Sequence, residues 1–196
     1  MRVNLPVTQY EYDFPDTSML VSTTDTKGII THCNPAFIDA SGFDHDELVG
    51  QPHNLIRHPD MPPQAFKDLW ATVGRGHTWT GLVKNRRKDG GFYWVRANVT
   101  PIMENGKPRG YLSVRTKPGR AEVQLAESLY ARLRADLAAQ RETIRLRHGQ
   151  VVYPGLRGLL QRLQQVSATQ TLALMLLGVV LAGMLPRWLG GEGAGV

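Results

Sequence analysis

The stretch WTGLVKNRRKDGGFYWVRANVTPIMENGKPRGYLSVR, residues 79–115, decides the fold of this 196-residue chain. Asp-Gly at 89–90 and Asn-Gly at 105–106 are the strongest short signals for a β-hairpin turn. Between and beside these turns lie three segments rich in β-branched and aromatic residues, which favour strands: Trp79–Asn85, Phe92–Met103 and Gly110–Arg115. The stretch therefore predicts three consecutive antiparallel strands.

Upstream of these strands, the chain alternates short strand-like and helix-like segments. Met19–Thr23 and Gly28–Cys33 predict two further strands. Side-chain caps and helical spacing of apolar residues predict three helices: one capped by Asn34 and running to Ser41, one capped by Asp44 with Glu47 at the capping-box position, and one over Pro63–Val73. Together these elements predict an α+β domain over residues 18–117, preceded by an arm or cap over residues 1–17.

Downstream of Pro118-Gly119, residues 118–165 read as amphipathic linker helices. We expect a helix over Ala121–Leu146, in which Leu125, Leu129, Leu133 and Leu137 form one stripe, and a short amphipathic helix over Leu156–Leu163. Residues 166–185 carry no charge, so 166–189 is a candidate transmembrane helix, with a buried or coiled-coil helix as the alternative. Residues 190–196 form a short tail.

The overall composition narrows the class of protein. Hydrophobic residues make up 42% of the chain, which is enough for a core. The formal net charge of +6 invites a nucleic-acid partner, but the arginine surplus lies directly before the apolar run, which suits an anionic membrane surface better. We therefore expect membrane lipid as a partner and no nucleic acid. The single cysteine, Cys33, excludes an intrachain disulfide and is predicted to be a buried thiol.

Two groups of residues could bind a ligand. The run GQPHNLIRHPDMP, residues 50–62, holds polar groups on a segment too broken for a long helix, and is either a ligand-binding connector or a solvated loop. The tryptophans Trp70, Trp79 and Trp94 could stack on a flat ring, amides such as Asn34 and Asn85 could bind its edge, and nearby cations suit phosphates: Arg57, Lys84, Arg86 and Arg87. The alternative is that the tryptophans are core residues and the amides satisfy backbone groups. No Rossmann or P-loop motif occurs, no metal site is indicated, and nothing calls for catalysis.

Several motifs resemble a known family. Asn34–Phe37, Ser41–Phe43 and Glu47–Gly50 resemble the PAS-domain signature. With residues 50–62, VKNRRK at 83–88 and YWVRAN at 93–98, they resemble the flavin-binding PAS sensors of bacterial aerotaxis receptors over roughly residues 8–120. The resemblance implies a PAS fold with a five-stranded antiparallel sheet and flanking short helices. It also implies bound FAD and a non-enzymatic role in sensing redox state or oxygen.

The resemblance also implies positions for the site. Arg57, His58 and Asp60 fall in the segment that closes over the flavin, and the pocket positions are Asn34, Trp70, Trp79 and Asn85. Arg87 is among the cations available to the phosphates. A haem-binding gas sensor, with His53 or His58 as axial ligand, and a cofactor-free PAS dimerisation module are the alternatives.

The same resemblance gives expectations for location and output. Because positively charged residues stay on the cytoplasmic side, we expect the chain at the bacterial inner membrane with its PAS domain in the cytoplasm. The family's signalling region does not follow the apolar run in this sequence. We therefore expect output through a homodimer, or through a separate chemoreceptor contacted by the leucine stripe, with a truncated gene product as the alternative.

Overall fold

The computed structural model describes residues 3–153. The chain divides into two compact units, residues 1–152 and residues 153–196. The expected helix over Leu156–Leu163, the candidate transmembrane helix over 166–189 and the tail over 190–196 lie outside the described residues. Within residues 3–153, no helix is both long and apolar enough to cross a bilayer.

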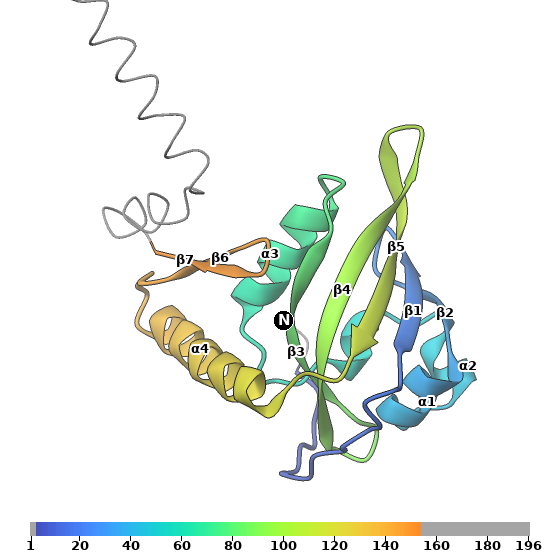
Figure 1. The fold of residues 1–196 in the computed structure, drawn as a ribbon, viewed down its shortest axis with the longest axis horizontal. Helices are drawn as coiled ribbons and strands as arrows, with labels where there is room; N and C mark the ends of the chain where they lie inside the picture. Colours follow the sequence, from blue (N-terminus) through green and yellow to red (C-terminus); the bar gives the residue numbers. More distant parts are fainter. Residues whose placement is uncertain (1–2, 154–196) are drawn as a thin grey trace, which may run out of the picture. The chain divides into compact units, whose positions relative to one another are not determined.

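A five-stranded antiparallel sheet forms the centre of the domain (Figure 1). Its strands are β1 (Leu20–Asp25), β2 (Ile30–Cys33), β3 (Trp79–Arg86), β4 (Phe92–Glu104) and β5 (Lys107–Thr116). They lie in the order β2-β1-β5-β4-β3, so the first and last strands in sequence bring the two halves of the domain together. The predicted α+β class and five-stranded sheet are confirmed.

The turn residues explain the register of the hairpin between β4 and β5. Asn105 and Gly106 have φ angles of 50° and 76°, the two positive values that a type I′ turn requires. Such a turn matches the right-handed twist of the strands that it joins. It fixes the pairing that runs from Glu104↔Lys107 to Arg96↔Thr116, with one irregularity at Ile102 and Met103.

Short helices connect β2 to β3. They are α1 (Pro35–Ser41), α2 (His45–Leu48), the 3₁₀ helix η1 (His53–Ile56) and α3 (Pro63–Val73). The three α-helices were predicted from the sequence, whereas the 3₁₀ helix lies in the run 50–62, where no helix was expected. The Asn34 side chain accepts a hydrogen bond from Phe37 N at 3.0 Å, as an N-cap should. Asp44 and Glu47 form the predicted capping box of α2.

The helix α4 (Arg120–Ala138) packs on β3 and β4. Its buried residues recur at helical spacing: Val123, Ala126, Tyr130 and Leu133. The Tyr130 hydroxyl donates to Leu82 O at 2.5 Å, and the Tyr130 ring stacks on Trp94 with centroids 6.3 Å apart. The leucine stripe is therefore divided, because Leu133 is buried while Leu125 and Leu137 are exposed.

The expected helix over Ala121–Leu146 is too long, because α4 ends at Ala138. The buried Asp136 carboxylate accepts hydrogen bonds from Thr143 N at 3.0 Å and Thr143 Oγ1 at 2.5 Å, which folds the chain back on itself. The strands β6 (Arg145–Arg147) and β7 (Gln150–Val152) follow as a hairpin.

The N-terminal arm packs against the domain. Thr8 N and Tyr12 N donate to Gly90 O and Phe92 O at 2.8 and 2.7 Å, which places the arm along the start of β4. Nearer the N-terminus, Asn4 is buried, and its amide donates to the carbonyls of Asn54 and Arg57 at 2.8 and 2.9 Å. The arm therefore holds the η1 segment in place.

Cys33, the single cysteine of the chain, lies at the end of β2. Its side chain is buried, as predicted, with 3% of the residue exposed. Burial raises the pKa of its thiol above the ordinary value, which disfavours the reactive thiolate.

Candidate functional site

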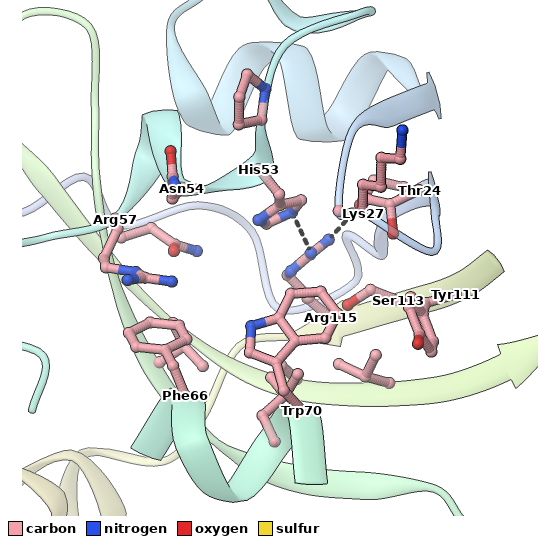
Figure 2. A pocket seen from close by; sticks show the side chains of 18 residues that line it. Thr24, Lys27, His53, Asn54, Arg57, Phe66, Trp70, Tyr111, Ser113 and Arg115 are labelled. Carbon is pink, nitrogen blue, oxygen red and sulfur yellow. Dashed lines mark hydrogen bonds between the residues drawn. The ribbon is translucent and has the colours of Figure 1, made fainter. Parts of the chain in front are cut away.

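A cavity of about 220 Å³ lies between the sheet on one side and η1 and α3 on the other (Figure 2). The sheet supplies its floor because alternate residues of a strand face the same side. Antiparallel pairing sets Ser22 opposite Ser113 and Val99 opposite Ser113, which aligns the inward side chains of β1, β5 and β4. The connector after β2 and the first turns of α3 then cover this floor.

The apolar part of the cavity suits a flat ring. Val83, Ala97 and Val99 form its floor on β3 and β4, while Phe66, Leu69 and Trp70 form the α3 wall. The Trp70 ring meets Tyr111 edge-on, with centroids 5.4 Å apart and an interplanar angle of 69°. Trp70 remains 40% exposed, so its indole lies at the rim of the cavity.

The charged lining is entirely cationic. Of the eighteen residues that line the cavity in the described part of the chain, none is acidic, whereas Lys27, Arg57 and Arg115 carry positive charge. Arg57 lies over the Phe66 ring, 3.5 Å from its centroid, and burial lowers the pKa of its guanidinium. A cavity with this lining favours a ligand that is, or becomes, negatively charged.

Arg115 is the most deeply placed of these cations. Only 4% of it is exposed, and burial lowers the pKa of its guanidinium to about 10. Its two terminal nitrogens lie 3.1 Å from Ser22 Oγ and 2.7 Å from His53 Nε2. Burial and the charge of Arg115 hold the pKa of His53 well below its usual range, so His53 is neutral and its Nε2 accepts from Arg115.

Several buried polar atoms of the lining lack a hydrogen-bond partner among the described residues. They are Asn54 Oδ1, Arg57 Nε and Ser113 Oγ. Buried polar groups in native proteins are nearly always paired, so a set of this kind around one cavity indicates a ligand with matching groups. The set includes both donors and an acceptor, which suits the polar edge of a heteroaromatic ring.

Of the predicted site residues, Arg57, Trp70 and Asn85 line the cavity together, and an isolated β-bridge between residues 57 and 85 links the closing segment to β3. Asn34 lies outside the cavity, and its side chain binds backbone groups instead. Its side chain accepts from Val21 N at 2.9 Å and donates to Met19 O at 2.8 Å, in addition to capping α1.

Two further predicted residues are fully engaged elsewhere. Arg87 lies over the Tyr12 ring, and its Nη1 donates to Asp39 O and Ala40 O at 2.9 and 2.5 Å, so it binds the end of α1. Trp79 lies on the cavity side of β3 but outside the lining. Its ring is 2% exposed, and its Nε1 donates to Asp68 of α3 at 2.8 Å.

His58 and Asp60 lie behind the cavity lining. Lys84 Nζ is 2.7 Å from Asp60 Oδ2, and Asp60 N donates to His58 Nδ1 at 3.1 Å. Burial and the Lys84 charge lower the pKa of His58 to about 4. Burial raises the pKa of Asp60, but the hydrogen bond and charge of Lys84 outweigh it, so this pKa is lowered. These residues shape the closing segment from outside the lining.

Sequence reasoning missed much of the lining, including Ser22, Thr24, Lys27, Ser113 and Arg115. It covered His53 and Asn54 only as part of the run 50–62, with His53 also as an alternative haem ligand. The available signal was the two-residue period of the strands. Tyr111, Ser113 and Arg115 alternate along β5, and Ser22 and Thr24 alternate along β1. Applying this alternation to β5 would have identified Arg115 as an arginine that faces inward.

Comparisons with known proteins agree with this geometry. Residues 30–115 match the family model described as the PAS fold. The chain is 44% identical over 178 residues to the aerotaxis receptor of Escherichia coli, covering 89% of this chain and 34% of the receptor. It is 29% identical over 118 residues to a nitrogen fixation regulatory protein of Klebsiella pneumoniae, covering 60% of this chain and 23% of that protein.

The chain therefore spans about a third or less of the length of these two relatives. Among solved structures, the light state of the blue-light photoreceptor Aureochrome1 LOV aligns with a TM-score of 0.50 at 18% identity. That alignment covers 59% of this chain and 91% of the photoreceptor domain, and it supports the fold alone.

Proposed function

The chain contains a PAS domain and resembles the Escherichia coli aerotaxis receptor in sequence, and from this we propose that it is a flavin-binding sensor of redox state or oxygen. The observation that carries the proposal is the acid-free cavity, in which aromatic walls, unpaired polar atoms and the cations Arg57 and Arg115 converge. It acts in signalling and has no substrate of its own to transform.

The cavity residues fit a flavin ring. Trp70 and Phe66 offer apolar faces, and Asn54, Asn85 and Ser113 offer donors and acceptors for the pyrimidine edge. Reduction adds electrons to such a ring, and Arg57 and Arg115 would favour whichever form carries more negative charge. The neutral His53 would hold the Arg115 guanidinium in position while the ligand's charge changes.

The size of the cavity bears on which flavin it takes. At about 220 Å³ it is smaller than most ligand sites, which run from about 300 to 1,000 Å³. It would therefore enclose the ring and leave the rest of the cofactor along the surface. Lys27, exposed at the turn between β1 and β2, is available there to the phosphates of FAD.

The output of the sensor is part of the same proposal. The relative that covers most of this chain is named as an aerotaxis receptor, which supports a role in signalling through a second protein or a second copy of the chain. Arginines before the uncharged residues 166–185 support attachment to the inner membrane, with the PAS domain in the cytoplasm.

The visible absorption spectrum of the purified full-length chain tests the cofactor. We expect a yellow protein that releases FAD, identified by chromatography after denaturation. A colourless protein from flavin-replete cells would contradict the proposal. A Soret band would contradict it in favour of haem, for which His53 is the one histidine in the lining of the described cavity.

Two asparagines provide a matched pair of variants. Asn85→Ala removes a cavity amide and should lower the ratio of flavin to protein while circular dichroism stays close to the parent. Asn34→Ala removes three hydrogen bonds to the backbone and should lower thermal stability, by about 1–2 kcal/mol for the helix cap alone. Equal loss of fold in both variants would show that Asn85 is a core residue.

A further inference from the structure

Two sides of helix α3 contact different parts of the molecule. Leu69 and Trp70 line the cavity, whereas Gln64 and Asp68, one turn apart, lie outside its lining. Gln64 Nε2 donates to Leu133 O of α4 at 3.1 Å. Any displacement of the cavity wall therefore also moves the side of α3 that contacts the C-terminal part of the domain.

Asp68 makes the densest set of contacts on that side. Its Oδ2 accepts from Trp79 Nε1 at 2.8 Å, which ties α3 to β3. The same carboxylate accepts from His148 N at 2.9 Å and Gly149 N at 2.6 Å. These two amides belong to the turn between β6 and β7, so one side chain connects the cavity wall, the sheet and the hairpin.

The hairpin turn fits closely on β3. Gly149 has a φ of +79°, and a Cβ at this position would lie 1.8 Å from Thr80 O. Only glycine allows the turn to approach β3 closely enough for both amides to reach Asp68. The β6–β7 hairpin is thus held in place by two contacts: hydrogen bonds to the Asp68 carboxylate, and close packing of Gly149 against the backbone of β3 at Thr80.

We propose that Asp68 is a positioning residue that couples α3 to the β6–β7 hairpin. A shift of the cavity wall would then change the strength of the hydrogen bonds that hold the hairpin turn on Asp68. This deepens the proposed function and rests on it for the identity of the signal, but not for the existence of the coupling. The hairpin leads directly into residue 153 and the rest of the chain, which makes it the exit of the sensor domain.

Hydrogen–deuterium exchange of the full-length chain tests the coupling. Asp68→Ala removes the acceptor of the hydrogen bonds. Gly149→Ala prevents the close approach of the hairpin turn to Thr80 O without altering Asp68 or the cavity. Gly106→Ala is the matched control, because Gly106 lies in a similar turn, with a φ of +76°, but an added Cβ there would have no neighbour within 4 Å.

We expect the amides of residues 148 and 149 to exchange at least about tenfold faster in Asp68→Ala and Gly149→Ala than in the parent and Gly106→Ala. Exchange over residues 20–24, in the inner strand β1, should stay unchanged in all four proteins, which shows that the sheet is folded. Parental exchange at 148 and 149 in Asp68→Ala would overturn the proposal.

The second measurement compares oxidised protein with protein reduced by dithionite. Exchange over residues 145–152 should change on reduction in the parent and in Gly106→Ala, and should not respond in Asp68→Ala. The coupling would be overturned if exchange over residues 145–152 in the flavin-loaded parent stayed the same after reduction. A parent that holds no flavin would instead contradict the proposed function, while the first measurement would still decide whether Asp68 seats the hairpin.

Discussion

Arg115 is a buried cation with no carboxylate beside it among the described residues, and its energetic effect should change sign when the cofactor binds. A buried charge without an opposite charge lowers the stability of the folded state. We therefore expect Arg115→Met to hold less flavin, yet to melt at the same or a higher temperature once the cofactor is removed from both proteins. The measurements are the flavin-to-protein ratio and thermal unfolding with and without cofactor.

Arg96→Met is the control for this prediction. Arg96 pairs with Glu122 on the opposite face of the sheet, so its replacement should leave flavin retention unchanged. A loss of both flavin and cofactor-free stability in Arg115→Met would instead show that the guanidinium mainly supports the fold.

Two histidines with lowered pKa values, His53 and His58, predict how stability depends on pH. The pKa of His58 falls from 6.5 to about 4 in the folded protein, and the pKa of His53 is also lowered well below 6.5. The unfolded chain therefore takes up protons first as the pH drops below about 6.5, and the free energy of unfolding falls towards pH 4. Each unit of pKa difference corresponds to about 1.4 kcal/mol.

Urea unfolding between pH 7 and pH 4 measures this effect. His58→Gln should flatten part of the slope, and His45→Gln, at an exposed position, serves as the control. A slope that is the same in His58→Gln and in the parent would exclude His58 as a cause.

At the scale of elements, α4 gives the clearest test, because two of its leucines have opposite surroundings. Leu133 is 1% exposed and Leu125 is 73% exposed. We expect Leu133→Ala to lower the free energy of unfolding by about 2–5 kcal/mol, and Leu125→Ala to change it by less than about 0.5 kcal/mol. Comparable losses in both variants would mean that the exposed side of α4 is also buried, against a second copy or a partner.

Elements with local signals could be predicted from the sequence. The Asn34 cap, the capping box at Asp44 and the Asn-Gly turn each act within four residues, and each lies where it was expected. The end of α4 could not be predicted in this way. It depends on Asp136 becoming buried and binding Thr143, a contact that exists only once the helix has packed on the sheet.

The residues of the candidate site also differ in how well they could be predicted from the sequence. Arg57 and Asn85 could be identified because their residue types suit a ligand and the closing segment is rich in such types. Arg87 and Asn34 carry equally suitable groups, but backbone carbonyls and amides occupy them. Which polar side chains remain free for a ligand depends on how distant segments meet, as β1 and β5 do around Ser22 and Arg115.

At the scale of the whole molecule, the prediction concerns the membrane. We expect the full-length chain to remain in the membrane pellet after carbonate extraction, because residues 166–185 carry no charge and are about long enough to span a bilayer. A surface-bound helix would be released by carbonate. Recovery of the entire chain in the soluble fraction without detergent would exclude both forms of attachment.

The burial of Cys33 makes the chain well suited to spectroscopy with thiol-reactive probes. Since this is the only cysteine and its thiol is hidden at the end of β2, a cysteine introduced on the surface would be the preferred target of a spin label or fluorophore. Probes placed in pairs on the sheet and on the β6–β7 hairpin would report changes in their separation without background from the native residue. The same chain could then be followed in detergent, in lipid vesicles and in intact cells.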